Sequence, residues 1–160
     1  MANSVLVYHG SAVKVETPEI LRNGYFKDFG YGFYLTEYKS QAEKWAGRHR
    51  NGFVSVFNLD LSYKDKLSNL KFESINYDWL NFVANCRKGE QHNYDTVEGA
   101  MADDTVYNYV NDYLSGLITK EAFMELCKFK HPTHQIVFNT ERSLKYLEFR
   151  RCYSVQRKVL

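Results

Sequence analysis

The sequence predicts an α+β fold made of short strands and three or four helices. Two observations carry this prediction: runs of β-branched and aromatic residues recur along the chain, and other segments place apolar residues every three or four positions. Hydrophobic residues make up 44% of the chain and aromatic residues 16%, which excludes a disordered protein. The 160 residues fit one domain over residues 1–160, since a domain usually takes about 100 to 200 residues.

The first third of the chain is predicted to be mainly β-structure. Residues 5–9 form a buried strand that ends in a turn. Residues 24–36, rich in glycine and aromatic rings, form a loop and a short strand. Ser40 caps a short helix over residues 40–46, and residues 53–59 form a further strand.

The middle of the chain alternates helices with strands. Helical periodicity predicts helices over residues 75–87 and 103–114, the second behind two acidic residues that favour a helix N-terminus. Thr119 caps a further helix. Strands are predicted at residues 94–97 and 135–138.

The C-terminal segment is predicted to form a brief helix at residues 143–147 and an edge strand at residues 147–155. Six basic residues stand against two acidic ones between residues 141 and 158. Two readings of this charge stay open: cations that protect an edge strand, and a face for nucleic acid.

Charge and cysteine content narrow the function classes. The net charge of +2 gives no strong field for nucleic acid or an anionic membrane, so any phosphate site has to be local. Three scattered cysteines form neither a disulfide framework nor a Cys-x-x-Cys site, and the cytoplasm is the expected compartment. No stretch approaches the roughly 20 apolar residues of a membrane span, and no signal-peptide pattern begins the chain.

Common catalytic and metal-binding motifs are absent from the sequence. It contains no phosphate loop, no Gly-x-Ser-x-Gly and no His-Glu-x-x-His. His131 and His134 have zinc-like spacing, but Pro132 lies between them and the other histidines have no fixed relation to them. We therefore expect loop residues here and no metal site.

One ordered set of motifs stands out. His9 and a glycine follow the first predicted strand, and residues 30–34 read Gly-Tyr-Gly-Phe-Tyr. Trp45 comes eleven residues after Tyr34. This set resembles the His-Tyr branch of the ADP-ribosyltransferase superfamily, which includes diphtheria toxin and the poly-ADP-ribose polymerases. In that branch an acid begins a late strand, and Gln135 stands at the matching place here.

The resemblance is closer to a bacterial family, domain of unknown function 3990, also regarded as ADP-ribosyltransferase-like. The shared motifs cover most of the chain and lie in order at residues 8–11, 27–36, 94–95, 102–104 and 135–140. The resemblance implies a split, mixed β-sheet core with flanking helices that binds NAD in the cleft between the sheets. It also implies an NAD-dependent mono-ADP-ribosyltransferase, which takes NAD as substrate, needs no metal and modifies a macromolecule.

The resemblance assigns roles to individual residues. His9 would bond a ribose hydroxyl, and Tyr34 and Trp45 would enclose the cationic nicotinamide ring, each contributing about 0.5 to 2 kcal/mol. Gln135, together with Tyr34, would be catalytic and orient the reacting ribose. The other NAD-binding residues would be Gly10, Ser11, Gly32, Phe33 and Thr36. Candidates for the pyrophosphate are Lys27, Arg22 and Arg48.

Gln135 keeps a hydrogen bond but supplies no charge, which leaves three readings open. Gln135 supports transfer in a positioning role, or Asp103 or Asp104 enters the site as an accessory acid, or the domain binds NAD without turning it over. The structural reading of the two acids is a favourable charge in the first turn of a helix. Trp45 could equally be a core aromatic.

Partners and alternative functions follow from the same resemblance. It implies a toxin or defence effector paired with a small neutralising antitoxin protein, and it leaves the acceptor open among protein, DNA, RNA and small molecules. The alternatives are an inactive NAD-binding or protein-interaction module and an RNA 2′-phosphotransferase-like enzyme. The basic C-terminal segment is the cue for the RNA enzyme.

Overall fold

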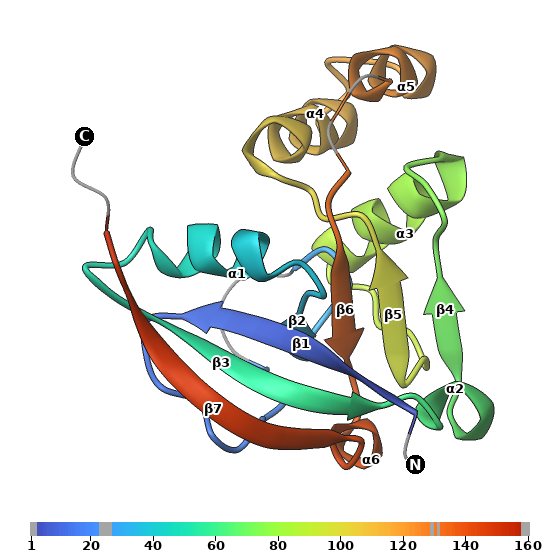
Figure 1. The fold of residues 1–160 in the computed structure, drawn as a ribbon. Helices are drawn as coiled ribbons and strands as arrows, with labels where there is room; N and C mark the ends of the chain where they lie inside the picture. Colours follow the sequence, from blue (N-terminus) through green and yellow to red (C-terminus); the bar gives the residue numbers. More distant parts are fainter. Residues whose placement is uncertain (1–2, 23–26, 129, 131, 158–160) are drawn as a thin grey trace.

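The computed structural model describes residues 3–22, 27–128, 130 and 132–157. Within these residues the chain forms two β-sheets and six helices, which confirms the predicted α+β fold (Figure 1). The strands β1, β3 and β7 of one sheet run across the view in Figure 1, and β4, β5 and β6 of the other stand upright beside them. The sheet is therefore split, as the resemblance implied.

The first sheet is antiparallel and has the order β1-β3-β7. It comprises β1 (Ser4–Ser11), β3 (Asn51–Asp60) and β7 (Leu147–Gln156). β7 is an edge strand, as predicted. The prediction of a buried first strand was wrong, because β1 is the opposite edge: of its eight residues, all of them described, only Val7 is buried.

The second sheet is mixed and has the order β2-β6-β5-β4. Its strands are β2 (Phe33–Leu35), β6 (Gln135–Phe138), β5 (Thr96–Gly99) and β4 (Asn69–Lys71). β4 runs parallel to β5, and the other pairs are antiparallel. The sequence pattern does not predict β4, since three residues are too few to show a recognisable alternation.

The helices are α1 (Lys39–Ala46), α2 (Tyr63–Lys66), α3 (Tyr77–Arg87), α4 (Asp104–Leu114), α5 (Lys120–Cys127) and α6 (Glu141–Leu144). Thr119 caps α5 as predicted, because its hydroxyl accepts a hydrogen bond from Ala122 N (3.1 Å). The predicted cap at Ser40 was wrong: α1 begins one residue earlier, with Tyr38 at the N-cap position. α6 begins two residues before its predicted start, and the one-turn helix α2 has no sequence signal. None of the helices within the described residues has the length and apolar character needed to cross a lipid bilayer.

Two apolar cores lie on opposite faces of β6. Ile136 and Phe138 pack with Val7 and Phe57 in the core between the two sheets. Val137 faces the other way, into the core that α3, α4 and α5 share with the second sheet. Because side chains alternate along a strand, Gln135 lies on the same face as Val137, at the start of β6.

Backbone hydrogen bonds join the two sheets at one corner. Tyr8 N donates to Thr36 O (2.8 Å), and Thr36 N donates to Tyr8 O (3.0 Å). This bridge ties β1 to the residue that follows β2. It thereby brings His9, the next residue of β1, beside Tyr34.

Candidate functional site

A pocket of about 200 Å³ lies at the corner where β1 meets the second sheet. Its walls come from β1, β2, α1, α4, the start of β6 and two loop segments around residues 27–28 and 101–102. The pocket is lined by residues of both sheets, and the apolar core between the sheets lies beside it. Six of the predicted residues line the pocket: His9, Gly10, Tyr34, Thr36, Trp45 and Gln135.

His9 is held as a neutral ring in the pocket wall. Its Nδ1 lies 2.7 Å from Tyr34 O, and because a carbonyl only accepts, Nδ1 carries the proton. The ring stacks on Phe33, with centroids 4.3 Å apart. Burial lowers the pKa of His9, and the nearby charge of Lys27 lowers it further. The hydrogen bond to the Tyr34 carbonyl raises the pKa, but by less than burial lowers it. Nε2 is therefore an unprotonated acceptor, suited to a ligand hydroxyl.

Tyr34 is anchored at its hydroxyl and carries a cation on its face. The hydroxyl donates to Gly30 O (2.6 Å) and accepts from Phe29 N (3.1 Å). Gly30 has a φ of 83°, a backbone conformation that favours glycine, so the turn that holds the hydroxyl depends on it. Lys27 Nζ lies 5.1 Å from the centroid of the Tyr34 ring, within cation–π range. The ring predicted to face nicotinamide therefore has a cation of the protein itself over its face.

Trp45 is not a core aromatic, because 41% of its surface is exposed. The buried face of α1 consists of Ala42 and Ala46 instead. A Cβ at Gly10 would clash with the backbone oxygen of Ala42, so this glycine lets α1 pack closely on β1 and sets the position of Trp45. The Arg48 guanidinium lies 4.5 Å from the Trp45 ring centroid.

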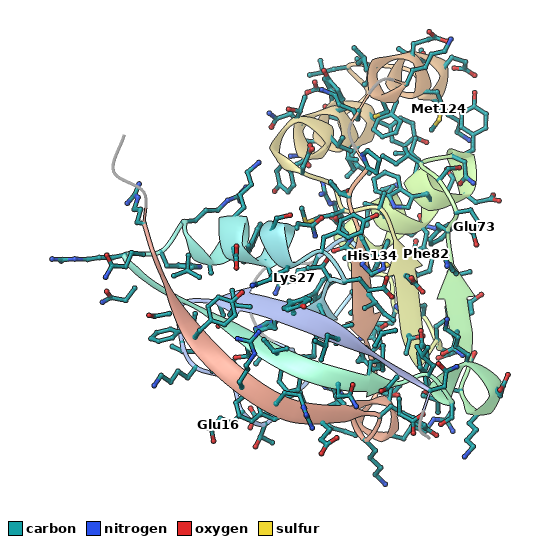
Figure 2. All side chains as sticks on the ribbon, viewed as in Figure 1. Glu16, Lys27, Glu73, Phe82, Met124 and His134 are labelled. Carbon is teal, nitrogen blue, oxygen red and sulfur yellow. The ribbon has the colours of Figure 1, made fainter. Side chains whose placement is uncertain are left out.

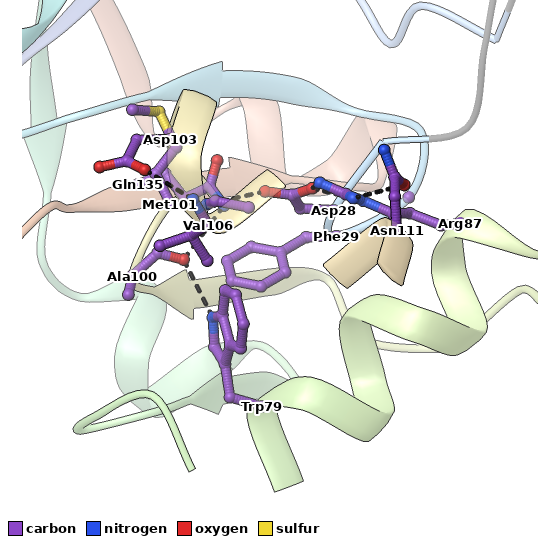
Figure 3. Close-up of polar contacts among 12 residues, drawn as sticks. Asp28, Phe29, Trp79, Arg87, Ala100, Met101, Asp103, Val106, Asn111 and Gln135 are labelled. Atoms are coloured by element: carbon purple, nitrogen blue, oxygen red, sulfur yellow. Dashed lines mark hydrogen bonds and ion pairs between the residues drawn. The ribbon is translucent and has the colours of Figure 1, made fainter. Parts of the chain in front are cut away.

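Gln135 is 5% exposed, and one hydrogen bond fixes the orientation of its amide. Nε2 donates to Ala100 O (3.3 Å), which also accepts from Trp79 Nε1 (3.0 Å), as Figure 3 shows. Since Ala100 O only accepts, Nε2 has to face it, and Oε1 is the atom with which Gln135 can accept a hydrogen bond from a ligand. An ionised carboxylate at this position could not donate to Ala100 O.

Asp28 places a carboxylate in the pocket wall, where three hydrogen bonds hold it (Figure 3). Arg87 Nε and Nη2 donate to Oδ1 (3.0 and 2.6 Å), and Ala102 N donates to Oδ2 (3.0 Å). The ion pair is well shielded, with side-chain exposures of 7% for Arg87 and 12% for Asp28. The guanidinium also lies 4.2 Å from the ring centroid of Tyr107, another residue of the pocket wall. Asp28 thus anchors the segment whose Ala100 carbonyl orients Gln135.

Three predicted NAD-binding residues lie outside the pocket wall: Ser11, Gly32 and Phe33. Phe33 belongs to the core between the sheets and supports the His9 ring from below. A Cβ at Gly32 would clash with the backbone of β6, so this glycine allows close strand packing. The Ser11 hydroxyl bonds to Val13 O at the exposed end of β1.

Asp103 has the structural role considered for it, at the start of a helix. Its Oδ1 accepts hydrogen bonds from Thr105 N (3.1 Å) and Val106 N (3.0 Å), so it is the N-cap of α4 and does not line the pocket. The side chain of Asp104 lies outside the described part of the chain.

His134 lies in the loop before β6, as predicted, and His131 lies outside the described residues. His134 Nδ1 accepts a hydrogen bond from Glu37 N (3.1 Å). The proton of the ring is therefore on Nε2, which donates to Glu98 Oε1 (2.9 Å). Glu37, Glu98 and His134 lie close enough to surround a cation, yet this tautomer offers no ring lone pair to a metal. Gln41 bonds both His134 N and His134 O, which fixes the approach to Gln135.

Eight further wall residues are not among the sequence-predicted binding and catalytic residues: Tyr8, Asp28, Leu35, Gln41, Ala42, Met101, Ala102 and Tyr107. A signal existed for Tyr8, Asp28, Leu35 and Ala102, which belong to the motifs at residues 8–11, 27–36 and 102–104. Of the three cations considered for the pyrophosphate, Lys27 lines the pocket, whereas Arg22 and Arg48 do not.

The comparisons with known proteins give one family. Its sequence model, described as Protein of unknown function (DUF3990), matches residues 5–149. No curated protein matches the chain. The matched range includes every described residue of the pocket wall.

Proposed function

Because this chain belongs to the DUF3990 family of unknown function, and because its pocket gathers His9, Tyr34 and Gln135 from three strands, we propose that it is an NAD-dependent mono-ADP-ribosyltransferase. The juxtaposition of these three side chains carries the proposal. They lie far apart in sequence, and a hydrogen bond from the His9 ring to the Tyr34 carbonyl joins two of them. Core packing alone would not require an unprotonated imidazole nitrogen, an anchored tyrosine face and an oriented amide around one cavity.

The proposed reaction breaks the bond between ribose C1′ and the nicotinamide nitrogen of NAD. The bonding electron pair stays on nicotinamide, which leaves neutral, and C1′ gains oxocarbenium character. A nucleophilic oxygen or nitrogen of the acceptor forms the new bond to C1′ and releases its proton to water. A site for this reaction has to hold a cationic ring, orient the ribose and tolerate positive charge at C1′.

The pocket residues fit these requirements. The Tyr34 face already attracts a cation, and exposed Trp45 stands at the same pocket. His9 Nε2 and Gln135 Oε1 are acceptors for ribose hydroxyls. A cavity of about 200 Å³ takes the nicotinamide and its ribose, and the rest of NAD would lie at the mouth. Typical pockets for whole small molecules hold about 300 to 1,000 Å³.

A second candidate function is an NAD-binding module without turnover. This function is favoured because neither Gln135 nor Asp28 offers a free negative charge to the reacting ribose. Gln135 is neutral, and both oxygens of Asp28 already accept hydrogen bonds, from Arg87 and from Ala102 N. The macromolecular acceptor and the neutralising antitoxin protein remain part of the proposal through the family resemblance.

Nicotinamide release tests the proposal. We would incubate the protein with NAD and cell extract and compare wild type with Gln135→Leu and with Gln91→Leu, a matched control at an exposed position outside the pocket. We expect release by wild type and Gln91→Leu and a loss of about 10²-fold in Gln135→Leu. NAD binding without release would favour the inactive module, and neither binding nor release would contradict both functions.

A further inference from the structure

The cation on the Tyr34 ring belongs to the protein itself. Lys27 Nζ lies over the ring face at 5.1 Å, and both residues line the pocket. Figure 2 places Lys27 near α1 at the junction of the two sheets. A cationic ring that enters the pocket therefore has to displace an ammonium group from the surface it needs.

Resting on the proposed function, we propose that Lys27 couples two subsites of the pocket, one for phosphates and one for a cationic ring on the face of Tyr34. The pocket then prefers ligands that carry both groups. When phosphates enter, the Lys27 ammonium leaves Tyr34 and binds them. The vacated ring face then receives the pyridinium. A cationic ring alone has to displace Lys27 with no anion to receive it.

Within the part of the chain that the structure describes, the Lys27 ammonium has no ionic partner of its own. Among the ion pairs of the described residues, none includes Lys27, and the adjacent carboxylate of Asp28 is engaged by Arg87 and Ala102. Lys27 is half-buried, and because burial removes water from the ammonium, it also lowers the pKa of Lys27. An incoming phosphate would supply the missing negative charge.

Lys27 can move without disturbing the wall. The next residue, Asp28, is fixed to α3 through Arg87 and to the following wall segment through Ala102. The four-carbon stem of a lysine rotates freely about such an anchored backbone. Movement of the stem would also enlarge the cavity of about 200 Å³, which is small for a dinucleotide.

The test uses two half-ligands: ADP, which carries the phosphates, and 1-methylnicotinamide, a permanent cationic ring. Calorimetry measures the dissociation constant of each alone and in the presence of the other. In wild type we expect each half-ligand to tighten binding of the other by the same factor, roughly 2- to 30-fold. In Lys27→Met this factor should fall to about 1, and 1-methylnicotinamide alone should bind more tightly than it does to wild type.

Two variants control the test. Lys120→Met removes another lysine that lies 5.1 Å from a tyrosine ring, Tyr77, but outside the pocket, and should keep the wild-type coupling. Lys27→Arg retains a cation and should keep coupling as well. Equal coupling in wild type and Lys27→Met would overturn the role of Lys27, while NAD binding and nicotinamide release would still support the proposed function. A protein that binds neither half-ligand nor NAD would overturn both.

Discussion

Asp28 and Asp95 have nearly the same contacts in two different regions of the molecule. Each carboxylate accepts two hydrogen bonds from one arginine and one from a backbone N–H. Asp95 lies away from the pocket, is 1% exposed and is bonded to Arg142, Ser68 N and the Thr140 hydroxyl. Its contacts tie the start of β5 to α6 and to the segment before β4.

The two sites differ in what the carboxylate holds. Asp95 joins elements of the fold, whereas Asp28 holds the wall segment that contains Ala100 and Ala102. That segment in turn orients Gln135. The difference teaches that an aspartate paired with an arginine can join elements of the fold in one place and hold a pocket wall in the other, so the two effects can be separated by matched substitutions.

The largest expected effect is on stability, at Asp95. In Asp95→Asn one carboxylate oxygen becomes an NH₂ group, and since both oxygens accept from two donors, a donor must then face another donor. We expect the free energy of unfolding to fall by roughly 3 kcal/mol, the upper end of the cost of leaving a buried polar group unsatisfied, because the Asp95 carboxylate is buried while Arg142 is exposed. Urea unfolding measures this change. NAD affinity of the folded protein should stay within about twofold, and a large loss of affinity would contradict the separation of the two regions.

The second expected effect is on activity, at Asp28. In Asp28→Asn the amide oxygen can still accept both bonds from Arg87, but the NH₂ group then faces Ala102 N. We expect a stability loss of about 1 to 2 kcal/mol and a fall of about 10- to 100-fold in the turnover number for nicotinamide release. The KM for NAD should change much less. An equal loss of stability and unchanged turnover would make Asp28 merely structural, like Asp95.

A third prediction concerns the missing acid. Gln135→Glu restores a charge near the reacting ribose but removes the donor to Ala100 O. Because the ionised carboxylate would face that carbonyl, we expect nicotinamide release to fall by about 10-fold. A rise in activity would show that charge at this position outweighs orientation, and Gln135→Leu gives the baseline without either.

The smallest expected effects are those of pH, and the two regions lose stability in different pH ranges. Hydrogen bonds from Arg142 lower the pKa of Asp95 to about 2 from 3.8, so its contribution is present above about pH 4 and is lost as the pH falls toward 2. Burial lowers the pKa of His9 from 6.5, so its contribution is complete above pH 6.5 and is lost as the pH falls through the folded-state value. Urea midpoints measured against pH should lose the first slope in Asp95→Asn and the second in His9→Gln. A second slope that persists in His9→Gln would assign that window to another group.

Much of the fold could be predicted because its elements carry local signals. Trp79, Val83 and Cys86 repeat at helical spacing on α3, and Thr119 is followed by a capped helix. α2 and β4 could not be predicted, since one turn and three residues carry too little periodicity. The edge position of β1 depends on pairing with β3 and on the packing of α1, which local residue patterns do not encode.

The pocket residues that could be predicted from the sequence are those that a local motif marks one by one. His9, Tyr34 and Gln135 stand at strand positions that the motifs mark, and they line one pocket. The supporting contacts were not predictable, because Asp28 and Arg87 lie 59 residues apart and meet through tertiary packing. Asp103 shows the reverse case: its charge pointed to the site, and the backbone of α4 uses it.

The most direct test of the account is whether NAD reaches His9. We would follow the ¹⁵N signals of the histidine rings while NAD is added, with the His9 signal assigned by its absence in His9→Gln. The account predicts that Nε2 of His9 starts as an unprotonated nitrogen and shifts on saturation as it accepts a ribose hydroxyl, while His49, outside the pocket, stays unchanged. NAD that binds without moving the His9 signal, or that does not bind, would contradict the assignment of this pocket as the NAD site.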